Sequence, residues 1–201
     1  RLATILIGGL GRQEVEDSLL KKHSLTLVTM DATDFVLPPL PNSIFTRDSS
    51  SWIYNGVSLN PMFYEARELE VVHAAAIYNW HPMFTEADFE FWYPDQDELG
   101  RFVQEDWGRA SLEGGDVMPI GNKTLLVGIG ERTTAQMVER LAQSLFRHGA
   151  VERVIACVMS KDRAHMHLDT IFTMVDRDAV TVYPKVTGQI RAYSLRPSDK
   201  A

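Results

Sequence analysis

The feature that most constrains the fold is a unit of two short strands, a helix and a third strand, which recurs along the chain. In the first copy, β-type runs within residues 52–59 flank Asn55-Gly56, a dipeptide typical of two-residue hairpin turns. A helix is predicted within residues 64–79 and a strand at 89–93. The helix would bury the apolar residues that share one of its faces: Ala66, Leu69, Val72 and Ala76.

The same order returns further along the chain. A second hairpin at residues 117–127, turning at 121–122, precedes a helix near 134–147 and a strand at 152–158. A third hairpin is predicted at residues 170–183. This order indicates an α/β (α+β) chain built from strand-strand-helix-strand modules. An ordinary mixed α+β domain has the same periodicity and remains an alternative.

The segments outside the modules suggest how the chain is divided. Residues 12–23 carry acids early and bases late, which favours a short amphipathic helix by dipole complementarity. Three prolines within residues 36–42 then exclude regular helix and predict an extended connection. We therefore expect a helical segment at 1–33 and a separate domain at 34–201, with a surface insertion at 95–110.

Composition excludes several classes of function. The chain has 20 basic and 27 acidic residues, a net charge of −7, and no run of Lys or Arg that could neutralise a phosphate backbone, so no nucleic acid partner is expected. No apolar run approaches the roughly 18 residues of a membrane span. The single cysteine, Cys157, lies in an apolar run and is interpreted as a buried structural thiol. A lone unpaired cysteine is typical of a reducing, cytoplasmic compartment.

Polar residues precede each of the three hairpins. Asp48 stands before the first, Glu113 opens Glu-Gly-Gly-Asp before the second, and His167 and Asp169 stand before the third. If the modules surround a common axis, these loop ends converge into one polar pocket. Taken singly, Asp48 could be a turn residue, Glu-Gly-Gly-Asp a flexible turn and His167 a core histidine. The paired glycines could also let the backbone approach a ligand closely.

A metal centre is a second interpretation of the same residues. His165 and His167 have the alternation that would place two imidazoles on one face of a strand, with Asp169 and Glu113 as further ligands. The chain has no second histidine pair and no cysteine cluster, which argues against a metal-dependent hydrolase. We assign no metal but keep this alternative.

Five segments in order along the chain resemble the bacterial arginine deiminase family. They are Pro-Asn-Ser-Ile-Phe-Thr-Arg-Asp at 41–48, Leu-Asn-Pro-Met at 59–62, Leu-Glu-Gly-Gly-Asp-Val-Met-Pro-Ile-Gly at 112–121, Gly-Glu-Arg at 130–132 and Met-His-Leu-Asp-Thr at 166–170. Each motif is weak by itself, whereas five at compatible spacing are specific. The resemblance implies an α/β propeller of five modules, of which this chain would hold about three as an incomplete propeller. Residues 1–33 would be the end of a helical insertion.

The resemblance also implies the roles of the polar residues. Asp48 and Asp169 would grip the substrate guanidinium, whose planar fork of donors suits paired carboxylates. His167 would be the general acid and base, and Glu113 would support it and raise its pKa. The substrate-binding residues would be the two arginines that hold the α-carboxylate and two pocket-lining residues: Arg67, Arg132, Asn42 and Phe45.

The family's activity is the hydrolysis of L-arginine to L-citrulline and ammonia through a cysteine-amidino intermediate, without a cofactor. The family's catalytic cysteine lies in a Gly-rich, His-Cys segment that this chain lacks, and Cys157 does not match it. The chain begins with Arg1 rather than Met. We therefore expect an inactive fragment that self-associates or pairs with the remainder of a longer chain. The alternatives are the metal-dependent hydrolase and a non-catalytic arginine-binding module.

Overall fold

The computed structural model describes residues 39–41, 43–98, 100, 102–103 and 108–198. The chain divides into two compact units, Arg1–Ile44 and Phe45–Ala201, and the elements below belong to the second. The helix predicted at 12–23, the boundary near residue 34 and the pocket-lining residue Asn42 lie outside the described residues.

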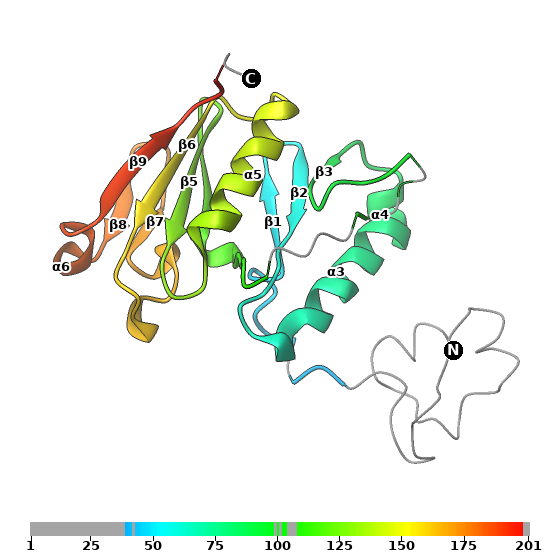
Figure 1. The fold of residues 1–201 in the computed structure, drawn as a ribbon, viewed down its shortest axis with the longest axis horizontal. Helices are drawn as coiled ribbons and strands as arrows, with labels where there is room; N and C mark the ends of the chain where they lie inside the picture. The colour runs from blue at the N-terminus through cyan, green and yellow to red at the C-terminus, as the bar shows by residue number, and fades with distance from the viewer. Residues whose placement is uncertain (1–38, 42, 99, 101, 104–107, 199–201) are drawn as a thin grey trace, which may run out of the picture. The chain divides into compact units, whose positions relative to one another are not determined.

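The first sheet has the order β1-β2-β3 (Figure 1). Strands β1 (Ser50–Ile53) and β2 (Gly56–Leu59) form an antiparallel hairpin, and β3 (Glu90–Tyr93) pairs with β2 in parallel. Between β2 and β3 the chain forms the 3-10 turn η2 (Glu65–Arg67) and the helices α3 (Glu68–Trp80) and α4 (Pro82–Thr85). The predicted strand-strand-helix-strand order is confirmed here.

The apolar face predicted for the first helix is wrong in part. Helix α3 begins at Glu68, so Ala66 lies in the preceding turn and is exposed, and Val72 is also exposed. The buried residue of α3 is Glu70. The buried position in the first turn of the helix is taken by Glu70 instead of an apolar residue, because its carboxylate is paired with Arg67.

The second sheet has the order β4-β5-β6-β9. Strands β4 (Val117–Gly121) and β5 (Thr124–Ile129) are antiparallel, β6 (Arg153–Val158) lies parallel to β5, and helix α5 (Ala135–Arg147) connects β5 to β6. Strand β9 (Arg191–Leu195) returns from far along the chain to pair antiparallel with β6, a pairing that the sequence did not predict.

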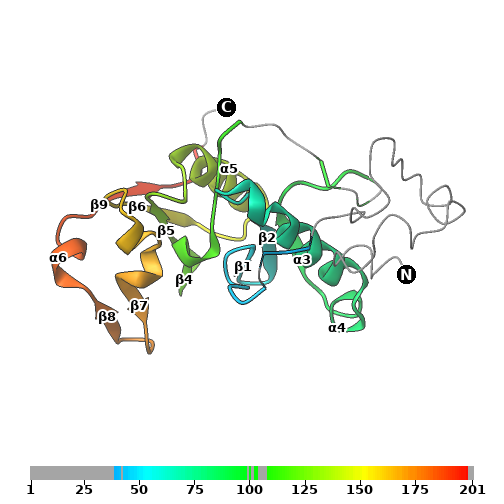
Figure 2. The ribbon, with the colours of Figure 1, turned by 90° about the horizontal axis from the view of Figure 1, so that it is seen from below.

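The third hairpin consists of β7 (Phe172–Met174) and β8 (Val180–Val182), followed by the short helix α6 (Pro184–Thr187). Helices α3 and α4 lie beside the first sheet, and this hairpin lies on the face of the second sheet opposite α5 (Figures 1 and 2). Within the described residues the strands form three separate sheets and no closed barrel. The mixed α/β class is confirmed, whereas the five-module propeller stays a prediction.

The main core lies between α5 and the two larger sheets. It is made of fully buried side chains from β1, β3, β5, β6 and α5: Ile53, Trp92, Leu125, Val127, Val154, Met137, Leu141 and Leu145. Cys157 packs in a second cluster with Met159 and Leu168, which agrees with the structural role predicted for this thiol. None of the described helices has the length and apolar character that a membrane crossing requires.

Candidate active site

The segments that precede the three hairpins meet at one place. Asp48 lies before β1, Glu113 begins the 3-10 turn η3 (Gly114–Asp116) before β4, and His167 begins the 3-10 turn η5 (Leu168–Thr170) before β7. All three side chains are buried, and one ligand-type atom of each lies within 4.8 Å of the others. The structure therefore brings together three residues that are distant in sequence.

A short hydrogen bond joins Glu113 to His167. The distance from His167 Nε2 to Glu113 Oε2 is 2.7 Å, and His167 Nδ1 faces Asp48 Oδ1 at 3.8 Å. Burial acts to lower the pKa of His167, but the hydrogen bond that the imidazole donates to Glu113 and the charges of Asp116, Asp48 and Glu113 outweigh it and raise the pKa. The arrangement favours the protonated imidazole.

The opposite shift occurs at Glu113. Burial acts to raise the pKa of this fully buried carboxyl, but the His167 hydrogen bond, the charges of Arg132 and His167, and the Phe63 N–H outweigh it. The net pKa is lowered, so Glu113 is held as the carboxylate. Glu113 and His167 thus form a buried pair with the proton on histidine.

Asp48 is paired with an arginine of the same chain. Arg67 Nη1 donates to Asp48 Oδ2 at 2.9 Å, and Arg67 Nε and Nη2 donate to the two Glu70 oxygens at 2.8 and 2.9 Å. The Arg67 guanidinium therefore pairs with the Asp48 and Glu70 carboxylates at once, and its hydrogen bond to Glu70 is the main cause of its raised pKa. Its Nη2 also donates to the backbone carbonyl of Phe45, whose side chain is 61% exposed.

Asp169 is paired in the same way. Arg47 Nε donates to Asp169 Oδ2 at 3.1 Å and Arg47 Nη2 donates to the Val117 carbonyl at 3.3 Å. Burial raises the pKa of Asp169, and the charges of Arg47 and His167 oppose this shift. The two carboxylates expected to grip a substrate guanidinium, Asp169 and Asp48, are each bonded to a guanidinium of this chain.

Arg132 is buried beneath two aromatic rings. Its guanidinium carbon lies 4.6 Å from the Tyr64 ring centroid and 5.7 Å from that of Phe63, and Nη1 lies 3.4 Å from Glu113 Oε2. Its Nε lies 3.4 Å from Glu131 Oε1. Arg132 is therefore not an ordinary exposed surface arginine, and its buried guanidinium lies next to the Glu113 carboxylate.

The two glycines of Glu-Gly-Gly-Asp allow other site segments to approach. A Cβ on Gly114 would overlap the carbonyl oxygen of Arg47, and a Cβ on Gly115 would lie 2.6 Å from His167 Nδ1. The Gly114 N–H also donates to the Asp48 carbonyl at 3.0 Å. Both glycines are thus required by contacts within the protein, and the ligand approach that the sequence suggested stays a prediction.

Three participants were not identified from the sequence. Arg47 and Glu70 serve as ion partners, and Asp116 is a fully buried carboxylate in η3. Asp116 lies in the Glu-Gly-Gly-Asp motif, so the motif itself was the signal. Glu70 follows Arg67 at a spacing that favours a helical ion pair, which could have predicted their contact.

The structure contradicts the strand geometry of the metal hypothesis. His165 ends the 3-10 turn η4 (Arg163–His165), and His167 caps η5, so the two imidazoles do not share a strand face. The His165 ring stacks on Tyr183 with centroids 5.7 Å apart. In the described part of the chain, the grouping with metal-ligand spacing is Asp48, Glu113 and His167, without His165.

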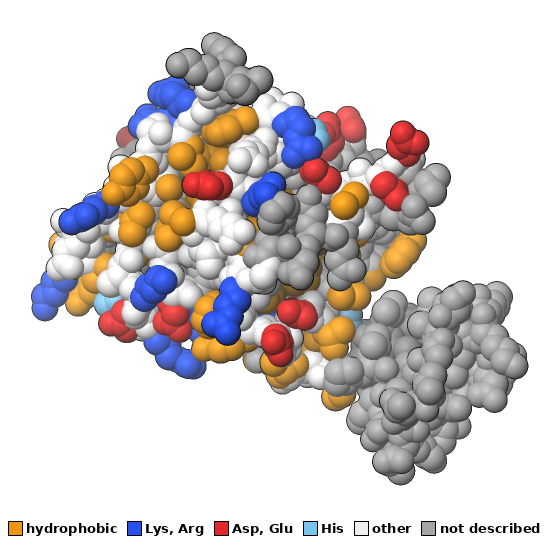
Figure 3. All heavy atoms as spheres, viewed as in Figure 1, with side chains coloured by type: hydrophobic (Ala, Val, Ile, Leu, Met, Phe, Trp, Pro, Cys, Tyr) orange, Lys and Arg blue, Asp and Glu red, His pale blue; other side chains and the backbone are white. Residues whose placement is uncertain are grey.

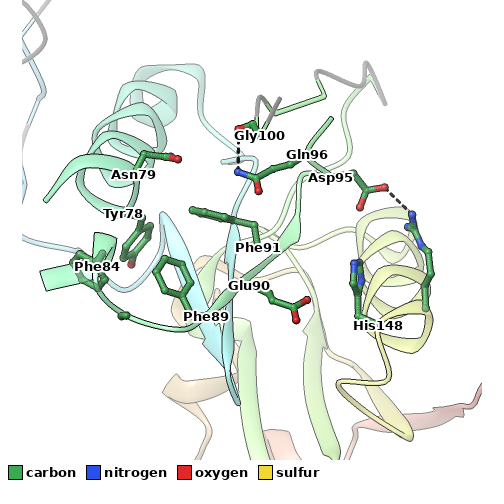
Figure 4. A pocket seen from close by; sticks show the side chains of 12 residues that line it. Tyr78, Asn79, Phe84, Phe89, Glu90, Phe91, Asp95, Gln96, Gly100 and His148 are labelled. Carbon is green, nitrogen blue, oxygen red and sulfur yellow. Dashed lines mark hydrogen bonds and ion pairs between the residues drawn. The ribbon is translucent and has the colours of Figure 1, made fainter. Parts of the chain in front are cut away.

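Two hollows lie away from this cluster. The first, of about 730 Å³, is lined by the aromatic residues Tyr78, Phe84, Phe89 and Phe91, with the Asp95–Arg147 ion pair on its α5 side (Figure 4). The second, of about 830 Å³, lies along α3 and residues 108–111. None of the converging acids or His167 lines either hollow, so neither is the candidate active site.

Comparison with known families agrees with the resemblance. The sequence model described as "Arginine deiminase" matches residues 2–201. The chain belongs to the arginine deiminase family. The solved structures that this family member resembles are less than 25% identical to it, so they establish the fold alone.

Three of these structures illustrate the similarity in fold. One is the N-terminal domain of the arginine dihydrolase ArgZ of cyanobacteria, in a cysteine-to-serine mutant bound to substrate, at 21% identity and a TM-score of 0.54, covering 74% of this chain and 47% of that one. Another is SxtG of Microseira wollei, an amidinotransferase, at 15% identity and a TM-score of 0.52, covering 70% of this chain and 42% of that one. The third is DDAH from Pseudomonas aeruginosa, a cysteine-to-serine mutant complexed with citrulline, at 18% identity and a TM-score of 0.50, covering 73% of this chain and 49% of that one. This arginine deiminase family chain spans about half the length of each.

Proposed function

We propose that this chain carries the guanidinium-binding and acid–base residues of an arginine deiminase, which converts L-arginine and water to L-citrulline and ammonium. The observation that carries the proposal is the buried Glu113–His167 pair beside Asp48 and Asp169, two carboxylates that already bind guanidinium groups in this chain. A site that binds the guanidinium of Arg67 or Arg47 has the negative charge and the acceptor geometry to bind that of a substrate.

The chemistry follows from these groups. Asp48 and Asp169 hold the substrate guanidinium, and a cysteine thiolate attacks its central carbon. As the C–N bond breaks, His167 gives its proton to the leaving nitrogen, which departs as ammonia. His167 then takes a proton from water, which attacks the amidino carbon, releases the thiolate and leaves citrulline. Glu113 keeps the imidazole protonated for the first step.

The thiolate is the part that this chain does not supply. Its single cysteine, Cys157, lies in β6 and is 7% exposed. Burial, with a further contribution from the Asp116 charge, raises the pKa of its thiol and disfavours the nucleophilic form. We therefore propose that the 201-residue chain binds arginine but does not turn it over.

Titration calorimetry and a citrulline assay test the proposal. We expect saturable arginine binding with a dissociation constant on the order of 1 mM, which is lost in Asp48→Asn, and no citrulline. Arg177→Gln, in the exposed β7–β8 turn, is the control variant and should bind as the unmodified chain does. Absence of binding would contradict the site assignment, and citrulline production abolished by His167→Gln would contradict the missing nucleophile.

Free arginine is the substrate that Arg67 and Arg132 favour, because both could pair with an α-carboxylate that agmatine lacks. In the present structure Arg67 is bound to Asp48 and Glu70, and Arg132 is bound to Glu113. Binding of the α-carboxylate therefore requires Arg67 to leave Asp48 as the substrate guanidinium enters. Agmatine that competes as well as arginine would contradict this substrate assignment.

A non-catalytic arginine-binding module is the second candidate, favoured by the burial of Cys157. It predicts the same binding by the isolated chain. The natural full-length protein separates the two candidates, because an arginine deiminase forms citrulline from arginine and a binding module does not.

A further inference from the structure

The two 3-10 turns of the candidate site are bound to one another by a buried carboxylate. Turn η3 carries Glu113 at its start and Asp116 at its end, and η5 carries His167 at its start and Asp169 within it. Asp116 has no solvent exposure. Its Oδ1 accepts the Leu168 N–H at 2.8 Å, and Leu168 stands between the two candidate site residues of η5.

The packing around Asp116 leaves its carboxylate little freedom. On the β5 side, a Cβ on Gly128 would overlap Asp116 Oδ1 and would lie 3.0 Å from the Leu168 Cβ. On the η5 side, the His167 ring packs directly on Gly115. The carboxylate is therefore held between a strand of the second sheet and the turn that carries His167.

We infer that Asp116 is a positioning residue of the candidate active site. Its hydrogen bond to the Leu168 N–H fixes η5 against η3, so that His167 meets Glu113 and Asp169 faces the same site. This inference rests on the proposed function, since it concerns residues assigned there. Asp116 does not contact substrate in this assignment and acts through the backbone of η5.

The surroundings of Asp116 give this role a second, electrostatic consequence. The groups that act on its charge are the Thr133 hydroxyl, the Leu168 N–H, His167 and Asp169, and its own charge acts on His167 and Cys157. The Asp116 charge is one of the causes that raise the pKa of His167. Displacing the carboxylate should therefore move both the η5 backbone and the titration of His167.

A matched pair of glycine substitutions on one segment tests this. Gly128→Ala inserts a methyl group against the Asp116 carboxylate, whereas a Cβ on Gly130 is closest to the flexible end of Met159, at 3.2 Å, and meets the Ser160 and Met166 carbonyl oxygens at ordinary contact distances of 3.9 and 4.0 Å. Both variants of the full chain are compared with the unmodified chain by amide hydrogen exchange at Leu168 and by NMR titration of the His167 imidazole. Neither measurement needs arginine, so a failure here is distinguishable from a failure of the proposed function.

We expect Gly128→Ala to speed exchange of the Leu168 amide on the order of tenfold, the loss of one charge-assisted hydrogen bond. The pKa of His167 should fall toward its ordinary value, and Gly130→Ala should change neither quantity. Asp116→Asn keeps an acceptor oxygen, so it should keep the Leu168 amide protected while lowering the His167 pKa through loss of charge.

Unchanged Leu168 exchange and His167 titration in Gly128→Ala would overturn the inference, as would equal changes in Gly130→Ala. If the Gly128→Ala chain does not fold, Asp116→Asn decides. A folded Asn variant in which the pKa of His167 falls supports the inference, and one in which the His167 pKa and the Leu168 exchange are both unchanged overturns it.

Discussion

The buried carboxylate of Asp116 should make stability depend on pH in a direction opposite to that of most acidic groups. Burial raises its pKa from the ordinary value of 3.8 to about 6, against the Thr133 hydroxyl, the His167 charge and the Leu168 N–H, which lower it. A raised pKa means that ionisation is harder in the folded chain than in the unfolded one. The cost to folding begins as pH rises above 3.8 and is complete above about 6.

The magnitude follows from the shift at Asp116. About two pKa units correspond to about 3 kcal/mol of lost stability at pH 7, and to only about 0.5 kcal/mol at pH 4, which lies just above the ordinary pKa, so that the unfolded carboxyl gains little free energy by ionising there. The amide side chain of the Asp116→Asn variant does not titrate. The stability of the Asn variant relative to the unmodified chain should therefore improve by about 2.5 kcal/mol between pH 4 and pH 7.

Urea unfolding followed by tryptophan fluorescence at several pH values between 4 and 7 measures this difference. Using the difference between two chains cancels the titration of groups that both share, apart from those coupled to Asp116. Asp178→Asn, which removes an exposed carboxylate from the β7–β8 turn, is the control and should show no such trend. A stability difference between Asp116→Asn and the unmodified chain that stays flat across this range would refute the reasoning.

Three further predictions concern the site and the surface. Glu113→Gln should lower the pKa of His167, which NMR titration measures. Because the pKa of His167 is raised in the folded chain, the Glu113–His167 pair stabilises the fold fully below about pH 6.5, and this stabilisation is lost as pH rises through the raised value. Arg47→Gln should free Asp169 and tighten arginine binding by about two- to fivefold in calorimetry, the range of a half-exposed ion pair; weaker binding would contradict this. The β7–β8 hairpin and β9 leave apolar side chains exposed, and Figure 3 shows hydrophobic side chains between charged ones on the β9 face, so sedimentation should detect self-association at high concentration.

Local signals predicted much of the fold. The turns at Asn55-Gly56 and Gly121-Asn122 and the amphipathic helix α5 were predicted because turn chemistry and helical periodicity act over few residues. The pairing of β9 with β6 was not, because β9 is mostly exposed and has no alternation to specify a partner.

The candidate site was predicted in its acids and its histidine but not in their partners. Asp48, Glu113 and His167 could be found because each stands at the same place in a repeated unit. The pairing of Arg47 with Asp169 could not, because an ion pair between residues so far apart leaves no local pattern. The alternation of His165 and His167 predicted a shared strand face, which is wrong because short 3-10 turns in this segment replace the strand that the spacing suggested.

The internal arginines change what arginine binding would be in thermodynamic terms. Asp48 and Asp169 already hold Arg67 and Arg47, so an incoming guanidinium replaces an equivalent group instead of entering a bare anionic pocket. Such an exchange conserves the number of close charge pairs. Its equilibrium constant should therefore vary little with ionic strength, in contrast to the steep salt dependence of a cation that binds unpaired carboxylates.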